Sequence, residues 1–225
     1  MNDKFSISNA AKVQKEKEYG LPSYSFSEEL LNAITHGIGI LFSLFAFVFL
    51  ILNSPCTLGS IIGTTIYCMS LFVLYTGSTL YHAVGVSKLK SRLRKFDHCS
   101  IFVLIAGTHT PLCINYIKGL ESKIVLIAVW IAAIIGIIIN AIDVNKYSKI
   151  SLGCYIVMGW SVLFMAKPTL YYLTVKQLIW LLIGGIFYTV GAIIYVVGKK
   201  IKYMHSIWHL FVLAGSVSHF IVFTI

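Results

Sequence analysis

The sequence is poor in charged residues. Only 12% of its 225 residues are Asp, Glu, Lys or Arg, and only eight are acidic, whereas 58% are hydrophobic. Soluble globular domains carry about 25% charged residues, so this composition excludes an ordinary soluble protein. It predicts a multi-pass protein of the cell (plasma) membrane, with membrane lipids as its expected partners.

The sequence also lacks closely spaced cysteine pairs and an evident cleavable signal peptide. Its cysteines are odd in number and never spaced as Cys-x-x-Cys, so they are expected to be small buried hydrophobes rather than disulfides or metal ligands. The first 27 residues are mostly polar, and the first apolar run is too long for a signal-peptide core. The first span is therefore expected to serve as its own signal. The cysteines are Cys56, Cys68, Cys99, Cys113 and Cys154.

Seven hydrophobic runs approach the roughly 20 residues that a helix needs to cross a bilayer. Short connections join them, and no internal repeat or separate soluble domain is evident. The prediction is an all-α fold, a single bundle of seven transmembrane helices over residues 28–225 after an amino-terminal tail of residues 1–27. The runs span residues 29–52, 57–85, 97–117, 122–142, 149–166, 175–197 and 204–224, of which the fifth is the weakest.

The basic residues are unevenly distributed. The formal net charge of +10 would suggest a nucleic-acid partner in a soluble protein, but here the Lys and Arg residues lie between hydrophobic runs. Fourteen of these 18 residues fall in the tail and in the connections on the same side of the membrane. Because basic residues concentrate on the cytoplasmic side, the amino terminus is predicted to be cytoplasmic and the carboxyl terminus outside. No nucleic-acid partner is expected.

The last hydrophobic run contains three histidines. His205 and His209 are four residues apart, so on a helix they share one face, about 6 Å apart along the axis. His219 lies 14 residues beyond His205, about 21 Å along a helix, and cannot bind the same ion. Ionisable side chains are costly inside a membrane and usually mark a partner, a pathway or a site. His205 and His209 are therefore a candidate metal-binding pair.

Further polar residues are expected at the same depth. The predicted orientation places His82 at the cytoplasmic end of the second run, with Ser78 one turn deeper, and Asp97 at the start of the third. Three histidine ligands and one open position are typical of catalytic zinc, which lowers the pKa of water toward about 7 and polarises a carbonyl. The predicted Zn²⁺ ligands are His82, His205 and His209. Asp97 is the candidate general base, and Ser78 a candidate hydrogen-bond donor to the water or substrate.

Polar residues of the first run also have structural interpretations. Ser25-x-x-Glu28 resembles a capping box, and both Glu28 and Glu29 suit a helix amino terminus. Glu28, Asn32 and His36 form an i, i+4 stripe. Asn32 and His36 are expected to form hydrogen bonds between helices rather than to bind metal. Because an intramembrane histidine is often only hydrogen-bonded to a neighbour, this simpler explanation stands beside the metal site.

Several short motifs occur along the chain from Glu28 onward. They are Glu28-Glu29, Asn32-Ala33-Ile34-Thr35-His36-Gly37, Ser78-x-x-x-His82, Asp97-His98, Ile105-Ala106-Gly107-Thr108, Gly184-Gly185-x-Phe187-Tyr188-Thr189-Val190-Gly191 and His205-Ser206-Ile207-Trp208-His209-Leu210-Phe211-Val212. Together they resemble the bacterial hemolysin III family over essentially this whole length. One departure is His109, where the family pattern has Tyr. His109 lies about 18 Å beyond Asp97 along a helix and is expected to be a core residue.

The resemblance implies a seven-helix protein related to the progestin and adipoQ receptors and, more distantly, to the alkaline ceramidases of the CREST superfamily. These relatives hold zinc near the cytoplasmic face. By resemblance, His82, His205 and His209 are the zinc ligands, with Ser78 and Asp97 around the bound water. Independently of the family, the glycines between residues 184 and 191 are expected to allow close helix packing.

Three functions are open from the sequence. The first is a zinc-dependent hydrolase of lipid amides or esters at the cytoplasmic side of the membrane, in which Asp97 moves the proton. The second is the pore-forming, haemolytic activity (cytolysis) that the family name implies. It ranks lower, because the polar residues concentrate in one layer instead of lining a path through the membrane. The third is a non-enzymatic regulator or sensor of membrane lipid state with structural zinc. The substrate and the oligomeric state are not predicted.

Overall fold

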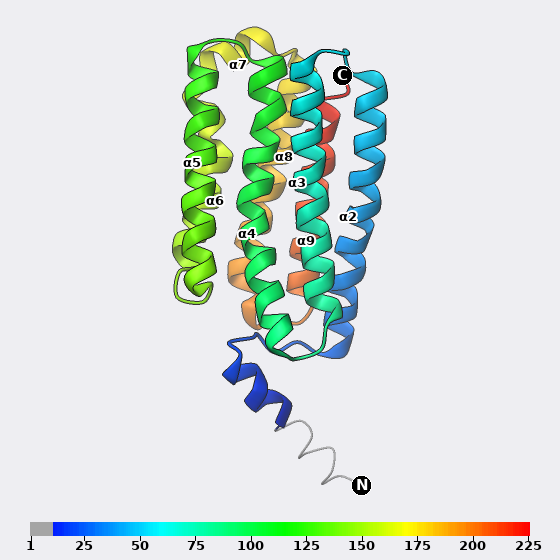
Figure 1. The fold of residues 1–225 in the computed structure, drawn as a ribbon, viewed down its shortest axis with the longest axis vertical. Coiled ribbons are helices and arrows are strands. Elements are labelled where there is room, and N and C mark those ends of the chain that lie inside the picture. The colour runs from blue at the N-terminus through cyan, green and yellow to red at the C-terminus, as the bar shows by residue number, and fades with distance from the viewer. Residues whose placement is uncertain (1–10) are drawn as a thin grey trace.

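The protein is an all-α bundle, as the composition predicts. The structure, a computed structural model, describes residues 11–225. Within this range seven helical segments are long and apolar enough to cross a membrane, and they run roughly parallel in a single bundle (Figure 1). All seven predicted spans are therefore confirmed.

The helices are numbered as in Figure 1. A short helix over residues 11–18 precedes the bundle. The third span continues α4 into a π-helical turn, η1, and the sixth ends in a 3₁₀ turn, η3. The bounds are α2 Phe26–Asn53, α3 Leu58–Ala83, α4 Lys88–Pro111, η1 Leu112–Tyr116, α5 Leu120–Asp143, α6 Ser148–Gly159, η2 Trp160–Met165, α7 Ala166–Tyr172, α8 Val175–Val197, η3 Gly198–Lys200 and α9 Met204–Val222.

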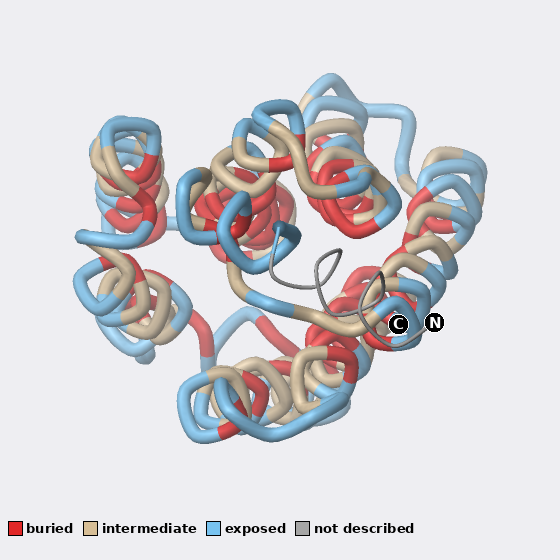
Figure 2. The backbone as a smooth tube through the Cα atoms, turned by 90° about the horizontal axis from the view of Figure 1, so that it is seen from below, coloured by how far each residue is buried: buried red, intermediate tan, exposed pale blue. Residues whose placement is uncertain are grey.

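The helices pack so that α9 lies beside both α2 and α8, while α3 lies between α2 and α4. The first and last spans are thus neighbours. Seen along the bundle, buried residues face inward and exposed ones face outward (Figure 2). The outward residues are largely apolar, such as Leu41 at 69%, Ile127 at 60% and Leu182 at 52% exposure. An outer surface of this kind suits a lipid environment, because hydrocarbon needs no polar contacts.

Two spans differ from their predicted limits. The third helix begins at Lys88, not near residue 97, with the hydroxyl of Ser87 accepting the N–H of Lys90 at 3.2 Å. The basic run expected in the connection therefore forms the first turns of α4. The weak fifth span is broken by a 3₁₀ segment between α6 and α7. Pro168 explains the break, because it has no N–H to bond the carbonyl four residues earlier.

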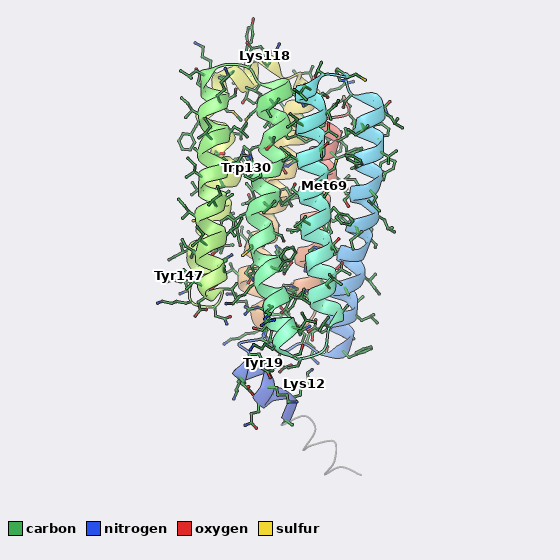
Figure 3. The ribbon with its side chains drawn as sticks, viewed as in Figure 1. Lys12, Tyr19, Met69, Lys118, Trp130 and Tyr147 are labelled. Atoms are coloured by element: carbon green, nitrogen blue, oxygen red, sulfur yellow. The ribbon has the colours of Figure 1, made fainter. Side chains whose placement is uncertain are left out.

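The two ends of the bundle have different character. We call the end with connections 84–87, 144–147 and 201–203 the basic end, and the end with connections 54–57, 117–119 and 173–174 the distal end. The amino-terminal segment packs on the basic end, where Arg94 Nη1 donates to the Gly20 carbonyl at 2.8 Å. Figure 3 shows Lys12 and Tyr19 at this end and Lys118 at the other. Residues 1–10 of the predicted tail, with Lys4, lie outside the described residues.

Two local predictions are confirmed. Ser25 and Glu28 form the capping box of α2, with the Ser25 N–H donating to Glu28 Oε2 at 2.9 Å. Gly184 allows close packing of α8 on α9, because a Cβ there would collide with the ring of His219. All five cysteines are free, but the expectation that they are buried holds only for Cys68 and Cys113, since Cys56 is exposed and the other two are partly exposed.

Candidate metal centre

The structure brings His82, His205 and His209 together at the basic end. His82 is in the last turn of α3, and the other two are in the first turns of α9. One ligand nitrogen of each lies within 4.8 Å of the others. The ring centroids of His82 are 5.1 Å from His205 and 5.2 Å from His209. The three imidazoles are therefore close enough to bind a single ion, and their role as ligands stays a prediction.

Two of these rings have their Nδ1 atoms held by acceptors. His82 Nδ1 donates to Glu29 Oε2 at 2.7 Å. His209 Nδ1 lies 3.2 Å from the Asn32 carbonyl oxygen and 3.1 Å from Thr35 Oγ1. A carboxylate and a carbonyl can only accept, so the proton of each neutral ring is on Nδ1 and the lone pair is on Nε2. This is the arrangement typical of metal-binding histidines.

The Nε2 atoms of His82, His205 and His209 are buried, and none has a hydrogen-bond partner among residues 11–225. Buried polar atoms normally have one. Three such atoms on neighbouring rings match the three nitrogen ligands of a catalytic zinc site. Neutral imidazoles also suit zinc better than magnesium or calcium, which prefer oxygen. The residues present therefore fit a zinc ion.

Glu29 has a role that the sequence did not reveal. The sequence predicts Glu29 only as an acid at a helix amino terminus, and it places Glu28 in the stripe with Asn32 and His36. In the structure Glu28 turns back to cap α2, and Glu29 binds His82 and, at 3.0 Å, Lys90 Nζ. Glu29, Asn32 and His36 have the spacing i, i+3, i+7, which also places side chains on one helix face. That spacing was the signal available in the sequence.

Asn32 and His36 behave differently from one another. Asn32 Oδ1 accepts a hydrogen bond from Ser206 Oγ on α9 at 2.5 Å, which confirms the predicted bond between helices. The same prediction is wrong for His36, since neither ring nitrogen has a hydrogen-bond partner in the described part of the chain. Its ring instead stacks on His209, with centroids 3.5 Å apart and planes at 14°. This contact fixes the plane of the His209 ring.

Asp97 and Ser78 are buried close to one another near the basic end. Asp97, on α4, is 2% exposed, and Ser78, on α3, is fully buried beside it. Asp97 Oδ2 and Ser78 Oγ both lack a hydrogen-bond partner within residues 11–225. A buried carboxylate oxygen without a donor is costly, so this pair is suited to bind a further polar molecule. Their catalytic roles stay predictions.

Two cavities meet this region. The interior cavity, about 140 Å³, lies between α4, α6, α8 and α9 and is lined at this end by His36, Asp97 and Trp208. The second, about 640 Å³, is a depression at the basic end whose lining includes His205 and Tyr24. The histidine group thus lies between an apolar interior and a polar entrance.

Tyr24 covers the histidine group from the amino-terminal segment. Its ring centroid is 5.2 Å from that of His205 and 5.9 Å from that of His82. Burial raises the pKa of the Tyr24 phenol well above its usual value, so the hydroxyl stays neutral and protonated. Tyr24 therefore adds no negative charge that would compete for a cation.

The chain is similar to several known proteins. A protein-family model described as "Haemolysin-III related" matches residues 24–220. The chain is 42% identical over 200 residues to "Hemolysin-3 homolog" of Bacillus subtilis (strain 168), covering 88% of this chain and 93% of that protein. It is 40% identical over 195 residues to "Hemolysin-3" of Bacillus cereus, covering 86% and 89%. It is 31% identical over 166 residues to the human "Monocyte to macrophage differentiation factor", covering 69% and 66%.

Proposed function

The chain belongs to the haemolysin III family and is a multi-pass membrane protein, and we propose that this protein is a zinc-dependent hydrolase of lipid amides or esters. Its candidate metal centre is then the active site. It acts at the cytoplasmic side of the cell membrane. One observation carries the proposal: three buried imidazole Nε2 atoms without partners in residues 11–225 lie together, and an equally unpartnered oxygen of Asp97 is buried beside Ser78, one turn of α3 from His82.

His82, His205 and His209 hold the zinc, and Glu29 and the Asn32 carbonyl orient two of them through their Nδ1 atoms. When bound, zinc supplies a Lewis acid that polarises a carbonyl and lowers the pKa of water toward about 7. Glu29 is paired with Lys90, and its negative charge makes His82 Nε2 a stronger electron-pair donor to a metal.

Asp97 moves the proton in this proposal. Its Oδ2 accepts a proton from the attacking water and returns it to the departing amine or alcohol, as a general base and then a general acid. Ser78 Oγ, beside it, donates a hydrogen bond to the substrate carbonyl oxygen. The low exposure of both residues supports this assignment, because electrostatic effects are strongest where water is excluded.

The two cavities supply the substrate's environment. The hydrocarbon chain lies in the interior cavity, among side chains such as Ile101, Leu104 and Ile105. The head group lies in the depression at the basic end, which includes Arg94 and Lys199. The scissile bond then lies between them, at the level of Asp97 and the three histidines.

The test is hydrolysis by the purified protein loaded with zinc, offered a panel of lipid amides and esters. Asp97→Asn is expected to keep the metal and lose about 10²- to 10⁴-fold in kcat, whereas His82→Ala is expected to lose metal and activity together. Glu121→Gln, an exposed acid at the distal end, is the control and keeps both. Absence of turnover on every lipid in the zinc-loaded wild type would refute the proposal.

The names of the bacterial relatives favour a second candidate, a haemolytic pore. Conductance of planar bilayers that contain the purified chain, unchanged by His82→Ala, would support a pore instead of the hydrolase. A third candidate is a lipid-state regulator in which zinc only links α3 to α9. Biological activity that survives Asp97→Asn but not His205→Ala would support this regulator.

A further inference from the structure

The interior cavity has a second polar region far from the histidine group. Along α4 it is lined from Asp97 to His109, 12 residues and therefore about 18 Å of helix. Its distal end is lined by His109, Trp160 and His219. The cavity is thus elongated along α4, with apolar side chains such as Ile101, Leu104 and Ile105 between its two polar ends.

His219 presents an unused acceptor at the distal end. Its Nε2 donates to the Leu181 carbonyl oxygen at 3.3 Å, so the neutral ring carries its lone pair on Nδ1. That Nδ1 is buried and has no partner among the residues the structure describes. The ring packs directly on Gly184, where a Cβ would collide with it. The contact holds the ring in place.

The neighbouring polar groups are already paired and neutral. His109 Nδ1 donates to the Ile105 carbonyl at 2.9 Å, and its Nε2 accepts from Ser161 Oγ at 3.0 Å. Thr189 Oγ1 accepts from Trp160 Nε1 at 3.0 Å. Within residues 11–225, Asp97 is the only Asp, Glu, Lys or Arg that lines the cavity, and it lies at the opposite end. The distal end therefore lacks a charged side chain that could bind an ion. What it offers is a hydrogen-bond acceptor, His219 Nδ1, to which a ligand could donate.

We propose that the distal end of the interior cavity is a subsite for a neutral hydroxyl, and that His219 Nδ1 accepts its hydrogen bond. The ligand is a long-chain lipid with a hydroxyl at the far end of its chain. The position of its other polar end, near Asp97 and the histidine group, rests on the proposed function. The distal subsite itself does not depend on hydrolysis.

The experiment compares two ligands of equal chain length. One is an N-acyl amide with a hydroxyl on the terminal carbon of its chain, and the other is the same amide without it. Binding is measured by displacement of a fluorescent lipid from purified protein whose metal has been removed by a chelator, so that turnover cannot interfere. The hydroxylated amide is expected to bind about five- to tenfold more tightly, as one added buried hydrogen bond predicts.

His219→Phe removes the acceptor and keeps a ring against Gly184, so it is expected to make the two affinities equal. Ser218→Ala is the matched control, because the Ser218 hydroxyl donates within α9 to the Ala214 carbonyl at 2.8 Å. It keeps the preference. If His219→Phe fails to fold, nitrogen NMR of the wild-type chain gives a second readout. The imidazole signals shift with the hydroxylated amide and not with the plain one.

Equal affinities of the wild type for the hydroxylated and the plain amide would overturn the proposal, and so would a preference that survives His219→Phe. A buried water would then be the partner of His219 Nδ1. Failure of the hydrolysis assay leaves this result unaffected, since binding is measured without metal. The two proposals therefore fail separately.

Discussion

At the scale of single residues, the histidine group depends on side chains that bind no metal. Glu29 accepts from His82 Nδ1 and from Lys90, and Lys90 also donates to the Tyr81 carbonyl at 2.7 Å. The two adjacent acids at the start of α2 thus have different structural roles. Glu28 stabilises the helix end, and Glu29 orients a ring on α3.

This division gives a matched pair of variants. Glu29→Gln is expected to weaken zinc binding by about 10- to 100-fold, because the carboxylate that orients and polarises His82 is lost. Glu28→Gln is expected to leave both the zinc affinity and the stability nearly unchanged, because Gln can also take this position in a capping box. Competition with a chromophoric chelator measures the first, and thermal unfolding the second. Equal zinc affinities in the two variants would contradict the assignment of Glu29.

The sequence could predict the three histidines but not Glu29. The i, i+4 spacing of His205 and His209, and the depth of His82, follow from helix geometry alone. Adjacent acids such as Glu28 and Glu29 differ by about 100° of rotation, so choosing between them needs a helix register that sequence leaves uncertain by a residue or two. The stacking of His36 on His209 also depends on how α2 and α9 pack, which no local pattern encodes.

At the scale of elements, hydrophobic length predicted every span, and local chemistry modified two of them. The first turns of α4 are basic rather than apolar, so a hydropathy criterion begins this span at residue 97, nine residues after the helix starts at Lys88. The break between α6 and α7 follows from Pro168, as the missing N–H requires. The position of each helix relative to its neighbours depends on small residues at the contacts.

Gly107 is one such contact, between α4 and α3. A Cβ there would collide with the Ser70 side chain and come within 3.4 Å of the Ile66 carbonyl oxygen. Gly107→Ala is expected to destabilise the fold by about 1–3 kcal/mol. Gly153→Ala on α6, where a Cβ meets no described atom within 4 Å, is expected to be neutral or to stabilise by about 0.5–1 kcal/mol. Thermal unfolding in detergent compares them, and equal melting temperatures would refute the close contact.

At the scale of the whole molecule, charge separates the two ends of the bundle. The proposed site lies at the basic end, close to the amino-terminal segment that carries Tyr24. The positive-inside rule predicts that this end is cytoplasmic. The site would then face the inner leaflet, and the distal end, with its hydroxyl subsite, would lie toward the outer leaflet.

Cys56 tests this orientation without a new label. It is exposed in the distal connection 54–57, whereas the other four cysteines lie within helices and are less exposed. A membrane-impermeant maleimide is expected to label intact cells at Cys56, and Cys56→Ser to abolish the signal. In a Cys56→Ser background, Lys202→Cys at the basic end is expected to react only after the cells are permeabilised. The reverse pattern would place the proposed site outside the cell.

The most direct test of the central claim is the metal content of the purified protein, measured by elemental analysis after expression with zinc. The account predicts about one zinc per chain, lost in His82→Ala, His205→Ala and His209→Ala and retained in His219→Ala, whose ring lies at the distal end of the cavity. A wild-type chain without zinc, or equal zinc in His82→Ala and the wild type, would contradict it.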